Sequence, residues 1–164
     1  LAVILSNHSD AGVMARAHRL KIPAYSFTTQ EMLEGSKPIA LLKELGIDLI
    51  VLAGYMCYIT APYLESFPDR IVNIHPALLP KFGGKGMYGH HVHEAVLAAR
   101  EKESGITIHL VDGHYDHGKI LRQAICPVLP EDTPDTLAER IHALEYAHYP
   151  EAIEEYLLRL PTES

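Results

Sequence analysis

The sequence predicts an α/β protein with a Rossmann-like, mostly parallel sheet and helices on both faces of that sheet. Two observations support this prediction. Short apolar runs of strand length alternate along the chain with segments of helical periodicity. Some of these runs are apolar throughout, which is typical of strands that are covered on both faces. The 164 residues contain no internal repeat and no linker, so we expect a single domain over residues 1–164.

The first part of the chain supplies three strands and three helices in the expected alternation. Each strand is a short apolar run, and these runs are LAVILSN (1–7), IPAYSF (22–27) and IDLIVLAG (47–54). The helices show apolar residues at helical spacing, and they cover residues 10–20, 37–46 and 61–67. Gly46 ends the second helix.

The second part begins with the buried strand RIVNIHP and a loop from Pro76 to Gly89. Four glycines and two prolines in this loop are too many for a regular element. The elements expected after the loop are a helix at 90–102, strands at 105–112 and 119–128 around the tight polar turn GHYDHG, and one or two helices at 133–160. Thr133 is suited to cap the last segment, with Pro134 at its first helical position.

Composition excludes several classes of protein. Apolar residues make up 48% and charged residues 21% of the chain, as in globular proteins. The net charge of −7 argues against a nucleic-acid partner, and no apolar run approaches the roughly 18 residues that a membrane span needs. Two cysteines are too few for a disulfide framework and indicate a reducing, cytoplasmic location. We expect small-molecule substrates and a monomer or homodimer.

Polar residues follow the predicted strands where ligands bind in open α/β sheets. Asn73 and His75 are two residues apart on one strand, so their side chains share a face, and Asp116 lies in the turn after a later strand. A carboxamide can donate to a developing oxyanion, and an imidazole can donate to it or move a proton. A nearby Asp116 raises the pKa of His75. The spacing alone also fits a simple strand end and an ordinary turn aspartate.

Four stretches together carry a more specific signal: IVNIHPALLPKF, GHHVHEAVLA, SGITIHLVDGHYDHGKI and HALEYAHYP. In this order, and over residues 1–150, the chain resembles the folate-dependent formyltransferases. The resemblance implies the formyltransferase fold. It also implies transfer of a formyl group from 10-formyltetrahydrofolate, a co-substrate, to the amine of glycinamide ribonucleotide in purine biosynthesis. No metal and no covalent enzyme intermediate are expected.

The resemblance also implies roles for particular residues. Asn73, His75 and Asp116 match the catalytic Asn, His and Asp of the family. In the implied mechanism Asn73 and His75 stabilise the tetrahedral oxyanion. Asp116 keeps His75 cationic and, through an ordered water, helps to remove a proton from the attacking amine.

Binding residues follow from the same match. The apolar walls of the folate pocket are expected from Met56, Tyr58, Ile59 and Leu64. The pterin edge is expected to meet the backbone of the turn that contains Val111, Asp112 and Gly113. Glu145 falls where the family holds the ribose hydroxyls of the nucleotide. Met56 and Tyr58 also fit plain core positions, and Glu145 fits a solvated helix face.

Some positions depart from the family pattern. The family opens with a strand and a glycine-rich phosphate loop, and SNHSDAG instead matches a later connection, so we expect a chain trimmed at its N-terminus. Cys57 stands where relatives often have Arg, Gly113 replaces a common acidic residue, and His142 stands where some relatives have Gln.

Two functional alternatives remain open from the sequence. A formyltetrahydrofolate deformylase would pass the formyl group to water, and a folate- or nucleotide-binding module of the same fold would not turn over. The tRNA-directed members of the family carry an extra C-terminal domain, for which no room follows Leu160. A zinc interpretation of the histidines at 90, 91, 93, 114 and 117 is weaker, because neither cysteine lies near them in the sequence.

Overall fold

The computed structural model describes residues 1–161, which fold as two compact units. The first unit comprises Leu1–Ile50 and Cys57–Pro68, and the second comprises Val51–Met56 and the described residues from Asp69 onwards, 69–161. The α/β class is confirmed. The expectation of a single domain over residues 1–164 stays a prediction.

The first unit is built on a parallel βαβ arrangement. Strands β1 (Ile4–Ser6) and β2 (Ala24–Ser26) pair in parallel, with Ile4 opposite Ala24. Helix α1 (Gly12–Arg19) connects them and buries Ala17 completely. Helices α3 (Ser36–Glu44) and α4 (Ala61–Ser66) lie within the expected ranges to within one residue.

Helix α2 (Thr29–Glu34) was not predicted from the sequence. Its six residues are too few to show a helical period, but its N-terminus carries a local signal. The Thr28 side chain accepts from the Glu31 backbone N–H, and the Glu31 carboxylate accepts from the Thr28 N–H. This capping box satisfies two backbone donors at once, so Thr-x-x-Glu was the pattern that could have located the helix.

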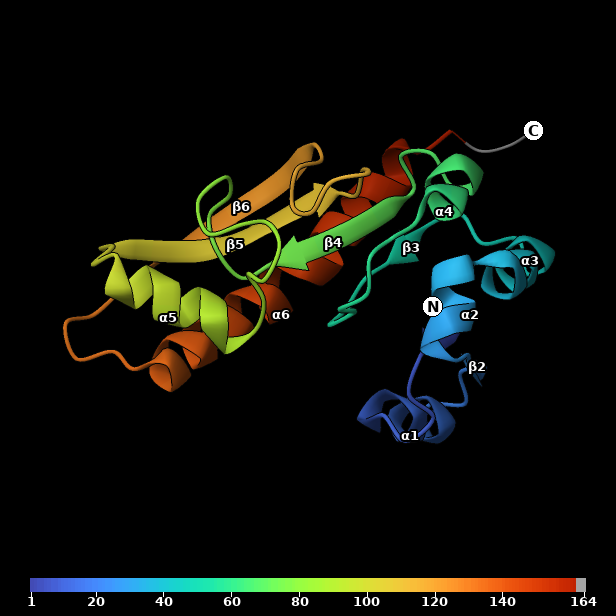
Figure 1. Cartoon of the computed structure of the whole chain (residues 1–164), viewed down its shortest axis with the longest axis horizontal. Helices are drawn as coiled ribbons and strands as arrows, with labels where there is room; N and C mark the ends of the chain where they lie inside the picture. The colour runs from blue at the N-terminus through green and yellow to red at the C-terminus, as the bar shows by residue number, and fades with distance from the viewer. Residues whose placement is uncertain (162–164) are drawn as a thin grey trace. The chain divides into compact units, whose positions relative to one another are not determined.

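The second unit is built on a mixed sheet with the strand order β3-β4-β5-β6, of which all residues but Ile50 belong to this unit (Figure 1). The strands are β3 (Ile50–Val51), β4 (Ile71–His75), β5 (Glu103–Leu110) and β6 (Ile120–Pro127). The pairs β4–β5 and β5–β6 are antiparallel. The tight turn expected between β5 and β6 is confirmed as an antiparallel hairpin, and the expectation of a mostly parallel sheet is corrected for the pair β4–β5.

Connection lengths explain the antiparallel pairs. Nine residues, 111–119, join β5 to β6, too few for the crossover that parallel neighbours need. The loop after β4 and helix α5 (His90–Ala98) lie beyond the C-terminal end of β4, so β5 starts from that side and runs back along β4 (Figure 1). This return brings residues of β5 directly opposite the polar end of β4.

Helix α6 (Pro134–Arg159) packs against β4, β5 and β6, and α5 packs against α6. The expected cap is confirmed, since the Thr133 side chain accepts from the Thr136 N–H and Pro134 opens the helix. The core of this unit contains the fully buried residues Ile71, Val72, Ile106, Ile108, Leu137 and Ile141. Within residues 1–161, no helix has both the length and the apolar character that a membrane crossing requires.

Candidate active site

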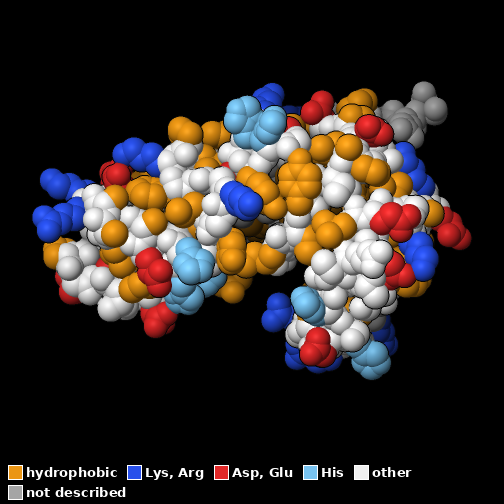
Figure 2. Space-filling view, viewed as in Figure 1, with side chains coloured by type: hydrophobic (Ala, Val, Ile, Leu, Met, Phe, Trp, Pro, Cys, Tyr) orange, Lys and Arg blue, Asp and Glu red, His pale blue; other side chains and the backbone are white. Residues whose placement is uncertain are grey.

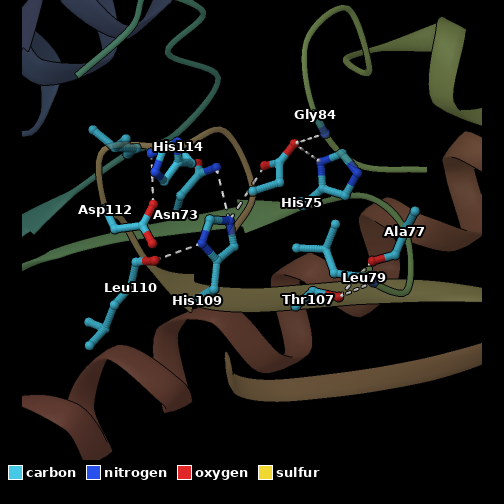
Figure 3. A network of polar contacts seen from close by, with 12 residues as sticks. Asn73, His75, Ala77, Leu79, Gly84, Thr107, His109, Leu110, Asp112 and His114 are labelled. Atoms are coloured by element: carbon cyan, nitrogen blue, oxygen red, sulfur yellow. Dashed lines mark hydrogen bonds and ion pairs between the residues drawn. The ribbon is translucent and has the colours of Figure 1, made fainter. Parts of the chain in front are cut away.

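Asn73, His75 and Asp116 belong to one polar network in the second unit (Figure 3). The network lies where β4 ends, between β5, the turn after β5 and the loop 76–89. His75 Nδ1 is 3.5 Å from Asp116 Oδ2, and both side chains are nearly excluded from solvent. Asn73 reaches the network through a third side chain, that of His109.

Two contacts fix the His75 ring. Its Nε2 lies 2.6 Å from the backbone carbonyl oxygen of Phe82, and a carbonyl only accepts, so Nε2 carries a proton and donates. The other nitrogen, Nδ1, therefore faces Asp116. In a neutral ring Nδ1 holds a lone pair and can accept a proton, whereas in a cationic ring it donates.

Burial lowers the pKa of His75 below the ordinary histidine value and is the largest influence on it. Asp116 and the Phe82 carbonyl raise that pKa, as predicted for Asp116, but they do not compensate for burial. His75 is consequently neutral at pH 7. The expectation that Asp116 keeps His75 cationic is corrected, because a ring with only 3% of its residue surface exposed loses most of its hydration.

Asp116 is held as a carboxylate. Its Oδ2 accepts from the Gly84 backbone N–H at 3.0 Å, and its Oδ1 lies 3.6 Å from His109 Nε2. Burial raises the pKa of Asp116, but the contacts with His109, His75 and Gly84 outweigh burial and bring the pKa below its ordinary value. The residue has φ +54°, a left-handed conformation that aspartate tolerates better than most residues.

The loop 76–89 approaches Asp116 closely at Gly83. A Cβ at Gly83 would lie 2.5 Å from Leu79 Cδ2 and 3.3 Å from Asp116 Cβ. A similar restriction holds at the base of the turn, because a Cβ at Gly118 would overlap the Leu110 carbonyl oxygen. The glycines thus allow both segments to close around the carboxylate.

Thr107 anchors the start of the loop. Its fully buried hydroxyl donates to the Ala77 carbonyl at 2.7 Å and accepts from the Leu79 N–H at 3.0 Å (Figure 3). The Gln123 side chain donates both to this hydroxyl and to the Leu79 carbonyl. A side chain of β5 therefore fixes the backbone that leads from His75 towards Phe82.

We expect Thr107→Val to lower the free energy of unfolding by about 2–4 kcal/mol, because it keeps the side-chain volume but leaves buried donors and acceptors unpaired. Thr107→Ser keeps the hydroxyl and removes one methyl group, so it is expected to cost only about 1 kcal/mol. Urea unfolding of the two variants measures the difference. A larger loss for Ser than for Val would contradict the assigned role of the hydroxyl.

The turn expected to meet the pterin is held largely by its own groups. Asp112 accepts from the His114 N–H at 2.8 Å and lies 3.1 Å from His117 Nδ1. The Val111 N–H donates to the Ile71 carbonyl at 2.9 Å, so the fold already uses that donor. Gly113 is exposed. Recognition of the pterin edge by Val111, Asp112 and Gly113 stays a prediction.

The other predicted binding residues lie on different elements. Met56 belongs to the second unit and is 60% exposed, which excludes the alternative of a core position. Tyr58, Ile59 and Leu64 belong to the first unit, where Ile59 is buried, Leu64 half-buried and Tyr58 exposed. Their assignment to a folate pocket stays a prediction.

Glu145 lies on α6 and is half-buried, with its Oε2 2.9 Å from His142 Nδ1. The carboxylate therefore has a partner one helical turn away. Its assignment to the ribose hydroxyls also stays a prediction.

The histidines outside the network do not gather around a metal position. Within residues 1–161, no three His, Cys, Asp or Glu side chains are placed to share an ion. Many histidines lie at the surface of the molecule (Figure 2). His90 lies near Asp135, His91 near Glu94 and His117 near Asp112, at 3.1–3.7 Å. These pairs are separate from one another.

His109 is the residue of this network that the sequence analysis missed. It is 2% exposed on β5 and stands directly opposite Asn73 in the β4–β5 register. A histidine among the apolar residues of the strand ITIHL was a usable signal, because a buried polar ring needs partners. The identity of those partners depends on the register, which the sequence does not show.

Three comparisons with known proteins, by family model, by sequence and by structure, all find formyltransferases. Residues 1–153 match the family model described as formyl transferase. Over 158 residues the chain is 39% identical to the chloroplastic phosphoribosylglycinamide formyltransferase of Arabidopsis thaliana, covering 93% of this chain and 54% of that protein. Over 154 residues it is 37% identical to the phosphoribosylglycinamide formyltransferase of Haemophilus influenzae, covering 92% and 70%.

Solved structures give the same result. The phosphoribosylglycinamide formyltransferase of Streptococcus pneumoniae aligns with a TM-score of 0.87 at 38% identity, over 96% of this chain and 87% of that one. Glycinamide ribonucleotide transformylase 1 of Symbiobacterium toebii aligns with a TM-score of 0.87 at 36% identity, over 100% and 77%. The chain spans about half the length of the plant relatives, with 54% and 51% covered.

Proposed function

Because the chain belongs to the formyl transferase family, we propose that it transfers a formyl group from 10-formyltetrahydrofolate to the primary amine of glycinamide ribonucleotide. This reaction is a step of purine biosynthesis. The observation that carries the proposal is the buried network of a carboxamide, a neutral imidazole and a carboxylate at the end of β4. The names of the relatives indicate which molecule accepts the formyl group and that the reaction is a formyl transfer.

The proton transfers of this reaction are assigned to His75. Its Nδ1 accepts a proton from the amine as the amine nitrogen bonds to the formyl carbon, and the C=O electron pair moves to oxygen. Collapse of the tetrahedral intermediate breaks the bond from the formyl carbon to N10 of the folate, and His75 returns the proton to N10. The ring begins and ends neutral, in agreement with its lowered pKa.

Asn73 and Asp116 stabilise the charges of the tetrahedral intermediate, which exists between the two proton transfers. The Asn73 carboxamide donates to the negative oxygen of the intermediate, a contribution of about 3–4 kcal/mol to transition-state stabilisation. The Asp116 carboxylate, 3.5 Å from His75 Nδ1, pairs with the imidazolium while it carries the extra proton. The positive charge on the His75 ring thus arises beside a carboxylate that already contacts this ring.

The rest of the assignment concerns binding and location. Folate is proposed to contact Met56, Tyr58, Ile59 and Leu64, together with the turn of Val111, Asp112 and Gly113, while Glu145 is proposed to hold the ribose. The protein is proposed to act on small molecules as a monomer or homodimer. Unpaired Cys57 and Cys126 support a reducing location such as the cytoplasm, although plant relatives are named chloroplastic.

A spectrophotometric folate assay tests the proposal. The full-length protein is mixed with 10-formyltetrahydrofolate, with and without glycinamide ribonucleotide, and formation of tetrahydrofolate is followed. We expect release that depends on the nucleotide. Equal formation of tetrahydrofolate without the nucleotide would show that the formyl group passes to water and that the protein is a deformylase. Folate binding without any release would replace it by a binding module.

A further inference from the structure

We propose that Tyr149 is a positioning residue that keeps Glu145 at a fixed distance from Asn73, so that the ribose and the amine of one acceptor molecule are held together. The inference rests on the proposed function, which assigns the ribose to Glu145 and the oxyanion to Asn73. It starts from a hydroxyl group that joins helix α6 to the sheet. The Tyr149 hydroxyl donates to the Leu52 carbonyl oxygen at 2.7 Å, and the Val72 carbonyl oxygen lies 3.3 Å from it.

The two carbonyl groups belong to neighbouring strands of the second unit. Leu52 directly follows β3, and its N–H donates to the Val72 carbonyl at 2.8 Å. Val72 is fully buried on β4 and directly precedes Asn73. The hydroxyl therefore ties α6, which packs along β4 (Figure 1), to the backbone next to the oxyanion donor.

Glu145 moves with this part of the helix. It lies four residues before Tyr149 on α6, and residues at that spacing share one helix face. The contact of Glu145 with His142 lies within α6, so it does not tie the carboxylate to the sheet. The bond made by the Tyr149 hydroxyl does so, one helical turn away.

The Tyr149 hydroxyl is a donor at every pH at which the protein is expected to work. Burial raises the pKa of Tyr149 above the ordinary tyrosine value, and the Glu145 carboxylate raises it further. A phenol that stays protonated always has its O–H available for the Leu52 carbonyl. The spacing between α6 and β4 is therefore not expected to change with pH through this group.

The spacing matters because one acceptor molecule must reach both elements. Its ribose is assigned to Glu145 on α6, and its amine must meet the formyl carbon beside Asn73 and His75 on β4. A displacement of about 1 Å between groups that bind and groups that react can cost about 10²-fold in rate. Loss of the Tyr149 bond is thus expected to affect nucleotide binding and turnover, but not the binding of folate.

Two tyrosines of α6 provide a matched pair of variants. Tyr149→Phe removes the hydroxyl and keeps the ring. Tyr156→Phe is the control, because the Tyr156 hydroxyl also donates to a backbone carbonyl, that of Asp69, which precedes β4 at the end away from Asn73. We expect Tyr149→Phe in the full-length protein to raise Kd for glycinamide ribonucleotide about 5–20-fold and to lower kcat about 3–10-fold, with KM for 10-formyltetrahydrofolate within about twofold. All three constants are expected to stay within about twofold of the wild type in Tyr156→Phe.

A double variant tests whether Tyr149 acts through the carboxylate. In a Glu145→Gln background the group to be positioned is already impaired, so adding Tyr149→Phe is expected to raise Kd for the nucleotide by less than about twofold. The same fold-increase in both backgrounds would overturn the inference, because it would show that the hydroxyl acts independently of Glu145.

Amide hydrogen exchange measures the link without any substrate. The Leu52 amide is expected to exchange about tenfold faster in Tyr149→Phe, because the backbone pair loses its tie to α6, and at the wild-type rate in Tyr156→Phe. Unchanged exchange in Tyr149→Phe, or an equal rise in both variants, would contradict the assigned link.

The outcomes separate this inference from the function on which it rests. A wild type that binds the nucleotide and transfers no formyl group contradicts the proposed function, while the Kd comparison still tests the role of Tyr149. A wild type that does not bind the nucleotide contradicts both. An active wild type with Tyr149→Phe at the same Kd and kcat contradicts the inference alone. Equal losses in the two Phe variants, in proportion to their melting temperatures, would also contradict it, because they would show a purely structural bond.

Discussion

Replacing His75 by alanine is expected to lower kcat for formyl transfer by about 10²–10³-fold. The substitution removes Nδ1, the group that accepts the amine proton and then pairs with Asp116 at 3.5 Å. The measurement is turnover at saturating concentrations of both substrates, with the folded fraction followed by circular dichroism. KM is expected to change little, because the nitrogen acts on the reacting atoms.

Two further variants make this result interpretable. His75→Gln keeps bulk in a buried position, so a similar loss of kcat with a melting temperature close to wild type would assign the effect to chemistry. His91→Ala serves as a matched control, since His91 is an exposed histidine on α5 that contacts nearby Glu94 and the Tyr88 ring. Wild-type turnover in His75→Gln would remove His75 from the proton transfers.

The candidate site could be predicted in part because its signals are local. Asn73 and His75 are two residues apart on a strand, which fixes a common side, and Asp116 follows a strand that the apolar pattern of ITIHLVD reveals. The structure places all three in one network. Element positions were predictable for the same reason, since apolar periodicity marks strands and helices without tertiary information.

The features that the sequence did not reveal depend on long-range pairing. β5 runs antiparallel to β4 because the loop 76–89 and α5 lie beyond the C-terminal end of β4, so that β5 starts from that end. The antiparallel register then places His109 opposite Asn73. The protonation state of His75 was misjudged because a neighbouring carboxylate is visible in a sequence, whereas the extent of burial is not. Pairing and burial are both properties of the assembled fold.

Asp116→Asn is expected to lower kcat by about 10²-fold while leaving the fold intact. Asparagine tolerates the left-handed φ of +54°, and its side-chain oxygen can still accept from the Gly84 N–H, so the turn is preserved. The negative charge opposite His75 is lost. Asp116→Ala is the contrasting variant, since it also removes the acceptor for Gly84 and is expected to lose stability as well as activity.

The pH dependence of Asp116→Asn gives the sharpest test of the electrostatic link. His75 must be neutral to accept a proton, and its pKa lies below the ordinary value, so wild-type kcat is expected to fall only on the acid side of about pH 6.5. Asp116 raises the pKa of His75. Its replacement by a neutral side chain must therefore move this acid limb to lower pH. Any change that arises from titration of the substrate amine is common to both enzymes and cancels in the comparison. A limb that moves to higher pH, or does not move, would show that Asp116 and His75 are not coupled as the geometry indicates.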